Sequence, residues 1–341
     1  MKKKIVILHS DISADATEDE LDCLQQADSI AEALRLLNYE PVLLPFELNL
    51  THTISMLQSL QPLVVFNIVE TLDSKGSLIY FAPAILDALH IPYTGCDTKA
   101  VFQTSNKPLA KKIMRYAGIS TPDWIEPDGF ASQNNKAKTY LIKSSWEHAS
   151  IGLDENSLIN NTNKEDILKE LDSRKEKLGG SCYAEAYIDG REFNVALISD
   201  KQGVKVLPIA EMLFKDYAPD KLQIVDYKAK WDVDSFEYHN TIRKFDFPSE
   251  DSPLILSLRE ISLQCWNIFS LRGYARIDFR VDNKGQPWIL EINTNPCLSP
   301  DAGFAAALEQ AQIKYHEAIG LIINNAKNKF CRIVNHFYED F

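Results

Sequence analysis

Apolar residues along the first ninety positions form either continuous runs or stripes at helical spacing. Continuous runs predict buried parallel strands over residues 4–8, 41–44 and 63–68. Helical spacing predicts a helix that follows a polar loop at 10–22 and ends near Leu37, and a second helix over 79–89. Strands that alternate with helices are typical of an α/β layer with a parallel sheet. No GxGxxG follows the first strand, which disfavours a nicotinamide-dependent oxidoreductase, the class that such a layer otherwise suggests.

The remainder of the chain predicts a mixture of helices and strands. Helices are expected over 106–116, 164–178, 254–268 and 304–326. Strands are expected over 139–143 and, within 181–198, on both sides of a turn at Asp189 and Gly190. Residues 214–252 have no clear period, and an irregular segment of that length in a compact protein is commonly functional, often as a lid.

A predicted β-hairpin within 273–299 carries the candidate metal chemistry. Two alternating runs flank a turn at 282–285. Arg276 and Asp278 share one face of the first strand, and strict alternation places Ile289, Glu291 and Asn293 together on the second. If these faces align, their oxygen atoms suit Mg2+, which prefers one or two carboxylates and completes its shell with water and phosphate. A solvated sheet face is the alternative, but it leaves the Asn-Thr-Asn-Pro turn after Glu291 unexplained.

Composition narrows the class of protein. A chain of 341 residues can form two or three domains, and 45% hydrophobic with 25% charged residues is typical of a soluble globular protein. A net charge of −12 argues against a nucleic-acid partner, which requires a basic surface. Six cysteines without CxxC spacing indicate reduced thiols, and no apolar run reaches transmembrane length. We therefore expect a cytoplasmic protein without a membrane partner.

The segments RIDF and LEINTNP, separated by a turn, resemble the metal-binding end of the D-alanine–D-alanine ligase branch of the ATP-grasp superfamily. The resemblance extends, in the same order and spacing, from about Ile5 to Ala326. It implies an ATP-grasp fold, in which an N-terminal open parallel α/β domain precedes two α+β domains that clamp ATP. The implied boundaries are 1–97 for the first domain, 98–180 for the central subdomain, 181–327 for the C-terminal subdomain with the metal site, and 328–341 for a tail.

This resemblance also implies a nucleotide site. The implied phosphate ligands are Lys107, Lys143 and Lys230, with the loop 144–152 and its Ser150 folding over the triphosphate. The implied adenine and ribose contacts are Glu185, Ala186, Tyr187, Ile188 and Glu192. The implied ligands of two Mg2+ ions, with Mn2+ as an alternative, are Asp278, Glu291 and Asn293. Taken singly, Lys107 and Lys143 would be interpreted as surface lysines, and Glu185 and Glu192 as exposed strand positions; the ordered set of motifs and their spacing favour the nucleotide site.

The implied reaction transfers the γ-phosphoryl group of ATP to a substrate carboxylate, and an amine then displaces phosphate to form an amide. Arg276, with the backbone N–H of Cys297, would stabilise the oxyanion, while Lys230 and Ser150 complete the catalytic set. Glu20 or Glu18 would contact the first substrate, unless these acids only favour the start of a helix. Asn67 and Glu70 follow a strand, where open α/β sheets bind ligands.

Three positions depart from the family on the substrate side. Ala149, Trp231 and Ala302 stand where relatives carry hydroxyl groups, and Asp301 would repel an acceptor carboxylate and suit a cation or a neutral polar group. We therefore expect an acid–amino-acid ligase, ADP-forming, whose small amino-acid-like substrates differ from two D-alanines. The alternatives are D-alanine–D-alanine ligase itself and an inactive ATP-binding module, which the intact metal set disfavours. A homodimer is expected.

Overall fold

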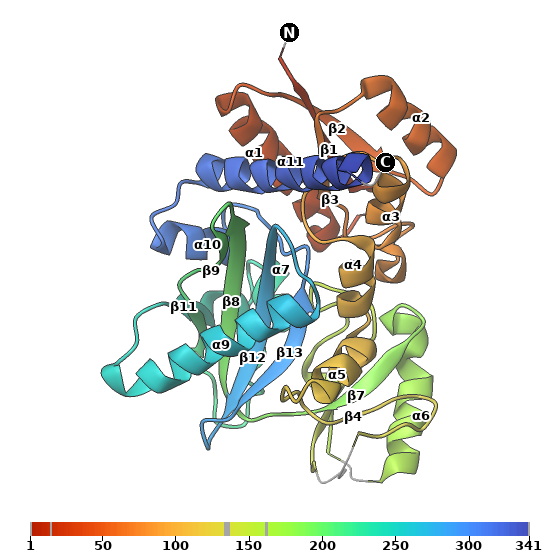
Figure 1. Ribbon diagram of the computed structural model, residues 1–341. Helices are drawn as coiled ribbons and strands as arrows, with labels where there is room; N and C mark the ends of the chain where they lie inside the picture. The colour runs from red at the N-terminus through yellow and green to blue at the C-terminus, as the bar shows by residue number, and fades with distance from the viewer. Residues whose placement is uncertain (1, 14–15, 133–136, 161–162, 340–341) are drawn as a thin grey trace.

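The computed structural model describes residues 2–13, 16–132, 137–160 and 163–339. A three-stranded parallel sheet begins the chain, with order β2-β1-β3, as the continuous apolar runs predicted. Its strands are β1 Lys4–Ser10, β2 Glu40–Phe46 and β3 Val64–Ile68. The helices of this layer are α1 Glu18–Leu36, α2 Leu50–Leu60 and α3 Phe81–Ala88 (Figure 1).

Two features of this layer differ from the sequence expectation. The polar loop expected as far as residue 22 is wrong in its second half, because α1 begins at Glu18, where Glu20 accepts a hydrogen bond from the backbone N–H of Thr17. Helix α2 was not predicted. Its N-cap Asn49 accepts from the backbone N–H of His52, and its threonine and serine residues obscure the apolar stripe.

The second part of the chain forms a four-stranded sheet with order β4-β7-β5-β6. Its strands are β4 Trp124–Ile125, β5 Tyr140–Ser144, β6 Leu158–Ile159 and β7 Cys182–Ala186. The helices are α4 Thr98–Ser105, α5 Lys107–Tyr116 and α6 Lys164–Arg174. Ile167 and Leu171 of α6 are fully buried against this sheet, so that α6 covers one of its faces.

The third part forms a six-stranded sheet with order β11-β10-β8-β12-β13, and β9 pairs with β8. Its strands are β8 Gly190–Asp200, β9 Gly203–Val206, β10 Ala210–Phe214, β11 Thr241–Lys244, β12 Tyr274–Asp282 and β13 Pro287–Asn293. Helix α9, Ser252–Ile268, packs against this sheet through Leu258 and Cys265, as predicted (Figure 1). The short helices α7 Tyr227–Trp231 and α8 Phe236–Asn240 occupy the irregular segment.

Strands β7 and β8 lie on either side of the expected turn, but they belong to different sheets. β7 pairs with β5 in the four-stranded sheet, and β8 pairs with β12 in the six-stranded sheet. Residues 187–189 therefore connect two sheets rather than closing a hairpin. Tyr187 and Ile188 of this connection line a cavity of about 600 Å³.

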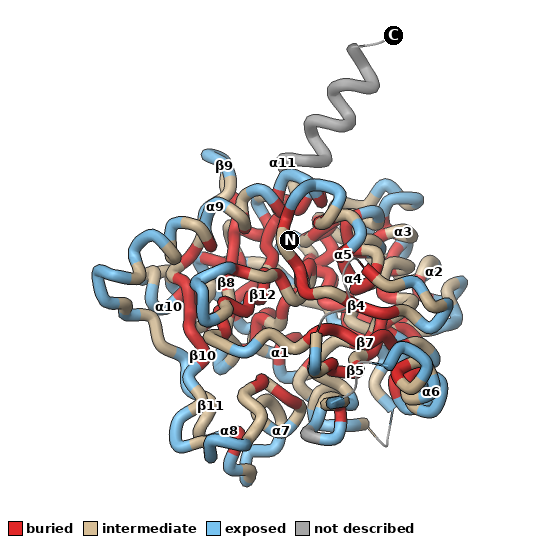
Figure 2. Tube along the Cα trace, turned by 90° about the horizontal axis from the view of Figure 1, so that it is seen from below, coloured by how far each residue is buried: buried red, intermediate tan, exposed pale blue. Residues whose placement is uncertain are grey.

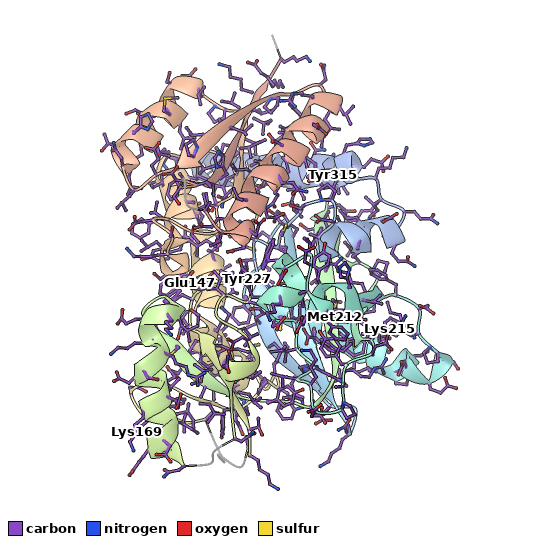
Figure 3. All side chains as sticks on the ribbon, turned by 180° about the vertical axis from the view of Figure 1, so that it is seen from behind. Glu147, Lys169, Met212, Lys215, Tyr227 and Tyr315 are labelled. Carbon is purple, nitrogen blue, oxygen red and sulfur yellow. The ribbon has the colours of Figure 1, made fainter. Side chains whose placement is uncertain are left out.

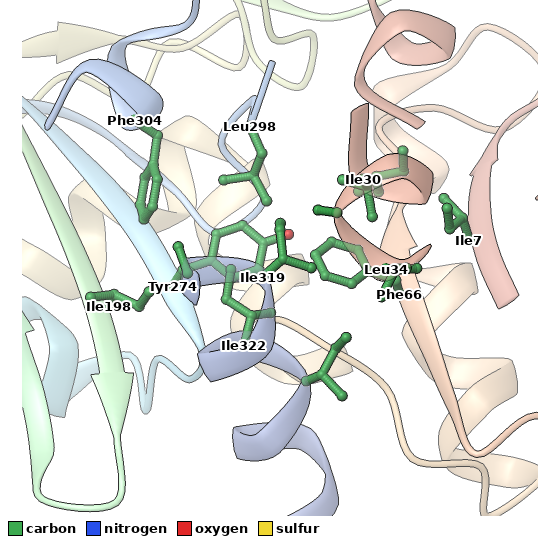
Figure 4. Packing of buried hydrophobic residues seen from close by; sticks show 14 of the residues in the cluster. Ile7, Ile30, Leu34, Phe66, Ile198, Tyr274, Leu298, Phe304, Ile319 and Ile322 are labelled. Carbon is green, nitrogen blue, oxygen red and sulfur yellow. The ribbon is translucent and has the colours of Figure 1, made fainter. Parts of the chain in front are cut away.

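The C-terminal region joins the first and third parts through one hydrophobic core. The single helix expected over 304–326 is wrong, because α10 Gly303–Gln310 and α11 Tyr315–Glu339 are separated by a break in which Gln312 has φ +58°. The shared core is drawn in Figure 4, with Ile7, Ile30, Phe66, Ile198, Tyr274, Phe304, Ile319 and Ile322 among its members. Each such residue stabilises the fold by roughly 1.5–3 kcal/mol when fully buried, so the parallel layer and the large sheet are held together.

Buried segments follow the strands of the sheets, and exposed segments lie at the rim, as Figure 2 shows. None of the helices, over the residues that the structure describes, has both the length and the apolar character needed to cross a membrane.

Candidate active site

The β12–β13 hairpin brings the predicted metal ligands together through a shift of register. Asp278 lies opposite Glu291, whereas the next residue, Phe279, lies opposite Ile289. Leu290 is therefore the extra residue of a β-bulge, and it returns Ile289 to the core face, where its side chain is fully buried. Strict alternation placed Ile289 beside Glu291, and that detail of the prediction is wrong. The shared face of Asp278, Glu291 and Asn293 is as expected.

A hydrogen-bond network fixes the carboxylate of Asp278. Arg276 donates to it twice, Nε to Oδ1 at 2.8 Å and Nη2 to Oδ2 at 2.9 Å. Asn194, across on β8, donates to Oδ1 at 2.9 Å, and Asn293 donates to Oδ2 at 3.1 Å and to Glu291 Oε1 at 3.2 Å. Burial raises the pKa of Asp278 in spite of Arg276. Sequence reasoning missed Asn194, although it alternates onto the same sheet face.

The donor set of this cluster fits a hard divalent cation. Two carboxylates and one amide, on Asp278, Glu291 and Asn293, are oxygen ligands of the kind that Mg2+ prefers. Burial opposes ionisation of Glu291, but the charges of Lys107 and Lys230 hold its pKa well below the usual range. Over the described ranges, no group of three or more His, Cys, Asp or Glu side chains could hold a metal alone. An ion here would complete its shell with water and phosphate.

Three lysines reach the same cavity from three different elements. Lys107, at the start of α5, donates to the backbone carbonyl of Glu147 at 2.6 Å, and burial lowers its pKa. Lys230, in α7, also has its pKa lowered by burial. Lys143, in β5, donates to Glu185 Oε1 at 2.6 Å. All three line one cavity of about 600 Å³ with the metal-ligand candidates.

Glu185 is held by two cations rather than one. Its side chain is 1% exposed, and Lys111 Nζ lies 2.5 Å from Oε2 while Lys143 approaches Oε1. Burial opposes ionisation of Glu185, but these two charges lower its pKa. Sequence reasoning missed Lys111. The sequence does contain an indication of its role, because Lys111 follows Lys107 by four residues and therefore lies on the same face of α5.

The connection between the two sheets forms another wall of the cavity. Ala186, Tyr187 and Ile188 line it, together with Glu192 of β8. Arg280 donates to the Tyr187 hydroxyl at 3.0 Å, and its Nη1 lies 3.6 Å from Glu192 Oε2. The predicted adenine and ribose contacts are therefore adjacent in space.

The loop 144–152 lines the cavity and is joined by two hydrogen bonds to residues of the 214–252 segment. Ser150 Oγ donates to the backbone carbonyl of Val225 at 2.9 Å, and Trp231 Nε1 donates to that of Ala149 at 3.1 Å. Both carboxylate oxygens of Glu147 accept from the backbone N–H of Gly76 at 3.1 Å, and the Tyr227 hydroxyl donates to Asp19 at 2.9 Å. Figure 3 labels Glu147 and Tyr227 near the middle of the molecule, where the N-terminal layer meets both other parts.

The acids expected to contact the first substrate do not reach the cavity. Both oxygens of Glu20 are used at the start of α1, by the backbone N–H of Thr17 at 3.0 Å and the hydroxyl of Ser74 at 3.2 Å, and Glu18 does not line the cavity either. Asp22, one helical turn after Glu18, lines it instead, together with Glu70. Sequence reasoning did not select Asp22.

The segment after β13 forms the far end of the cavity. Cys297, Asp301 and Ala302 all line it, and the thiol of Cys297 donates to Asp22 at 3.0 Å. Arg243 of β11 reaches the same corner, where its Nη1 donates to the backbone carbonyl of Asp301 at 3.1 Å. The expectation that Asp301 makes this region repel a carboxylate did not take account of Arg243, because no motif marks Arg243 within the irregular segment 214–252.

Comparison with known proteins identifies the family. A sequence model described as "D-ala D-ala ligase C-terminus" matches residues 112–324, more than half of the chain. The chain belongs to the D-alanine–D-alanine ligase family. The D-alanine–D-alanine ligase of Aquifex aeolicus is 28% identical over 311 residues, which cover 88% of this chain and 94% of the relative. An uncharacterised protein of Sinorhizobium fredii is also 28% identical over 311 residues, covering 89% of this chain and 88% of the relative.

Solved structures show the same fold. The D-alanine–D-alanine ligase of Bacillus anthracis complexed with ATP superposes with a TM-score of 0.71 at 20% identity, covering 97% of this chain and 99% of that one. The ligase of Coxiella burnetii gives 0.71 at 15% identity, covering 99% and 97%. The predicted ATP-grasp fold is thus confirmed, with an open parallel layer followed by two α+β sheets.

The loop 144–152 of this D-alanine–D-alanine ligase family member carries one further cavity residue. His148 lines the cavity, and its Nε2 is buried without a hydrogen-bond partner among the residues that the structure describes. Burial and the neighbouring Lys107 lower its pKa to about 4. The imidazole is therefore neutral at pH 7.

Proposed function

We propose that the protein is an ATP-dependent, ADP-forming ligase that joins the carboxylate of one amino-acid-like molecule to the amine of another. The observation that carries this proposal is the convergence of the acidic cluster, Asp278 and Glu291, with Lys107, Lys143 and Lys230 on one cavity of about 600 Å³. Family membership and relatives named D-alanine–D-alanine ligase support the reaction class. A cavity of this size accommodates a nucleotide and small substrates.

The lysines and the sheet connection would bind ATP. Lysine is a compact cation, and Lys107, Lys143 and Lys230 would each offset phosphate charge. Backbone groups of Ala186 and Ile188 would contact the adenine edge beside Tyr187, and Glu192 would accept from the ribose hydroxyls. Glu185 would accept from the exocyclic amine, since a carboxylate oxygen that already receives one hydrogen bond retains a second lone pair.

The acidic cluster would hold the divalent cation. Asp278, Glu291 and Asn293 are its proposed ligands, with two Mg2+ ions as the expected occupancy and Mn2+ as an alternative. When bound, the metal would supply charge stabilisation during phosphoryl transfer. The chain contributes the fixed positions of the carboxylates, which Asn194 and Asn293 orient by hydrogen bonds.

The amide would then form in two steps. The γ-phosphoryl group moves to the carboxylate of the first substrate, giving an acyl phosphate and ADP, and the amine of the second attacks the acyl carbon and displaces phosphate. Arg276, which Asp278 orients bidentately, and the backbone N–H of Cys297 would stabilise the oxyanion. The loop that carries Ser150, which a hydrogen bond joins to Val225, would help to exclude water from the acyl phosphate.

The first substrate would present its ammonium group to the N-terminal layer. Asp22 and Glu70, rather than Glu18 or Glu20, line the cavity there. Asp22 is held in place by hydrogen bonds from the Cys297 thiol and from the Ser299 hydroxyl at 2.8 Å. A cation between two carboxylates would relieve their mutual repulsion.

We propose substrates other than two D-alanines. Ala149 and Ala302 carry no hydroxyl, and the indole N–H that Trp231 offers is used on the carbonyl of Ala149. D-alanine–D-alanine ligation is the second candidate, favoured by the names of the relatives. The expected domains were 1–97, 98–180 and 181–327. Because β7, Cys182–Ala186, belongs to the four-stranded sheet, we propose that the second boundary lies instead in the connection at 187–189.

ADP release measured with Mg2+ and ATP, against pairs of D- and L-amino acids and β-alanine, tests the function. At least one pair should accelerate ADP release well above the rate with ATP alone and yield an amide detectable by mass spectrometry. D-alanine with itself should be slower than the best pair. If the fastest pair is two D-alanines, the substrate proposal fails and the ligase assignment stands; if no pair yields an amide, the ligase assignment fails.

A further inference from the structure

The guanidinium of Arg243 lines the cavity, and it forms no ion pair among the residues that the structure describes. Strand β11 holds it there by pairing with β10, where Arg243 lies opposite Met212. Its one hydrogen bond in the described structure goes to the backbone carbonyl of Asp301, at 3.1 Å. Among the residues that the structure describes, no carboxylate forms an ion pair with it, in contrast to Arg276 and Arg191. A guanidinium has five donors, so most of its capacity is free.

The surroundings of Arg243 favour the binding of an anion beside its guanidinium. Arg243 keeps an exposed surface, but partial desolvation and the charge of Arg276 lower the pKa of its guanidinium. Arg276 is already neutralised by Asp278, whereas Arg243 faces only the carboxylate charge of Asp301 at longer range. An added Cβ on Gly303 would lie 3.5 Å from Arg243 Nε, which places the guanidinium beside the start of α10. The N-cap Ala302 offers no side-chain cap there.

We propose that Arg243 binds the carboxylate of the amine-bearing substrate. This assignment rests on the proposed ligase function and names the class of acceptor: an amine that also carries an acidic group, such as an amino acid. Arginine recognises a carboxylate with two parallel hydrogen bonds, which also fixes its orientation. Arg243 thus supplies the donor that Ala302 lacks and offsets the charge of Asp301.

Matched acceptors test this assignment against a general structural role. Each amino acid that supports ligation is compared with its own carboxamide, which keeps the amine and loses the anion, at a saturating concentration of the first substrate. The variants are Arg243→Gln, Arg243→Lys and, as a control, Lys244→Gln. Lys244 is the next residue of β11 and does not line the cavity, so its replacement removes the same charge from the same strand.

Arg243→Gln should raise KM for the acid by about ten- to a hundredfold, the range expected for a lost hydrogen bond to a charged group. It should change kcat/KM for the carboxamide and KM for ATP by less than about threefold, and Lys244→Gln should behave as wild type. Arg243→Lys should recover part of the loss. Equal losses for acid and carboxamide in Arg243→Gln would overturn the assignment.

A binding measurement separates this result from failure of the proposed function. If no pair of amino acids is ligated, thermal unfolding is followed with Mg2+, ADP and each acid or carboxamide. An acid that raises the Tm of wild type and Lys244→Gln, but not that of Arg243→Gln, supports a carboxylate site without ligation. Stabilisation that is equal in wild type and Arg243→Gln, or absent from both, overturns it.

Discussion

Asp278 and Glu291 face each other across the β12–β13 ladder, one residue before the register shifts at Phe279 and Ile289. The bulge at Leu290 lets Glu291 face the cavity while Ile289 fills the core. Both carboxylates thus sit on rigid strands of a six-stranded sheet rather than on loops. Because the backbone of a paired strand has little freedom to move, the two carboxylates would form a preorganised site for the proposed divalent cation.

Neutralising either carboxylate should abolish metal-dependent turnover with little loss of fold. Glu291→Gln and Asp278→Asn keep the side-chain size but remove the charge of the proposed Mg2+ ligands, so ADP release should fall by at least about a hundredfold. Glu291→Gln is the cleaner variant, because Asp278→Asn also puts an amide group in place of an oxygen that accepts hydrogen bonds. Mn2+ binding, followed by electron paramagnetic resonance, should weaken in parallel. The control is Glu260→Gln, an exposed carboxylate on α9. ADP release within a few-fold of wild type in either variant would contradict the metal assignment.

Lys230→Ala should weaken ATP binding much more than adenosine binding, because the lost charge faces phosphate. Lys143→Ala should weaken both to some extent, since Lys143 also neutralises Glu185 beside the proposed adenine site. Calorimetric titration of each variant with ATP and adenosine measures the difference, with the exposed Lys112→Ala as control. Equal losses for the two ligands in Lys230→Ala would show that this lysine is structural.

Lys111→Met should destabilise the protein strongly even without nucleotide. The Lys111–Glu185 pair is buried at 0% and 1% side-chain exposure, and removal of one partner leaves an uncompensated charge. Such a loss typically costs about 3–5 kcal/mol. Because Lys143 still neutralises part of the Glu185 charge, we expect a loss at the lower end of this range for Lys111→Met. Denaturant unfolding measures the change in the free energy of unfolding. The double variant Lys111→Met with Glu185→Gln should recover stability, which a purely steric effect of Met would not allow.

Local patterns were sufficient to predict much of the fold. The parallel layer follows from continuous apolar runs, and the hairpin follows from alternation, since both depend on neighbouring residues. The break near Gln312 and the bulge at Leu290 depend on packing between distant segments, and strict periods could not show them. The difference between local patterns and contacts of distant segments also decides which site residues could be predicted. Motif residues such as Glu291 were found, whereas Asp22 and Arg243 reach the cavity from elements far away in the sequence.

Glu70 should make the stability of the ligand-free protein fall as pH rises. Burial, reinforced by Asp22 and Asp19, raises the pKa of Glu70 from 4.5 to about 8, although Arg276 and Lys230 oppose the shift. Between these values the folded protein holds a proton that the unfolded chain has released, so the free energy of unfolding decreases with pH in that window. Glu70→Gln removes this penalty. Its Tm should exceed that of wild type increasingly from pH 5 to pH 8, and the difference should level off above about pH 9.

Binding of a substrate should lower the raised pKa of Glu70 if an ammonium group occupies the space beside Glu70 and Asp22. A bound cation favours the ionised carboxylate, so the pKa of Glu70 falls and binding at pH 7 releases about one proton per site. Calorimetric titrations in buffers of different ionisation enthalpy count that proton. Wild type should release it and Glu70→Gln should not, while Glu260→Gln serves as the exposed control. Identical proton release in wild type and Glu70→Gln would show that the ammonium group binds elsewhere.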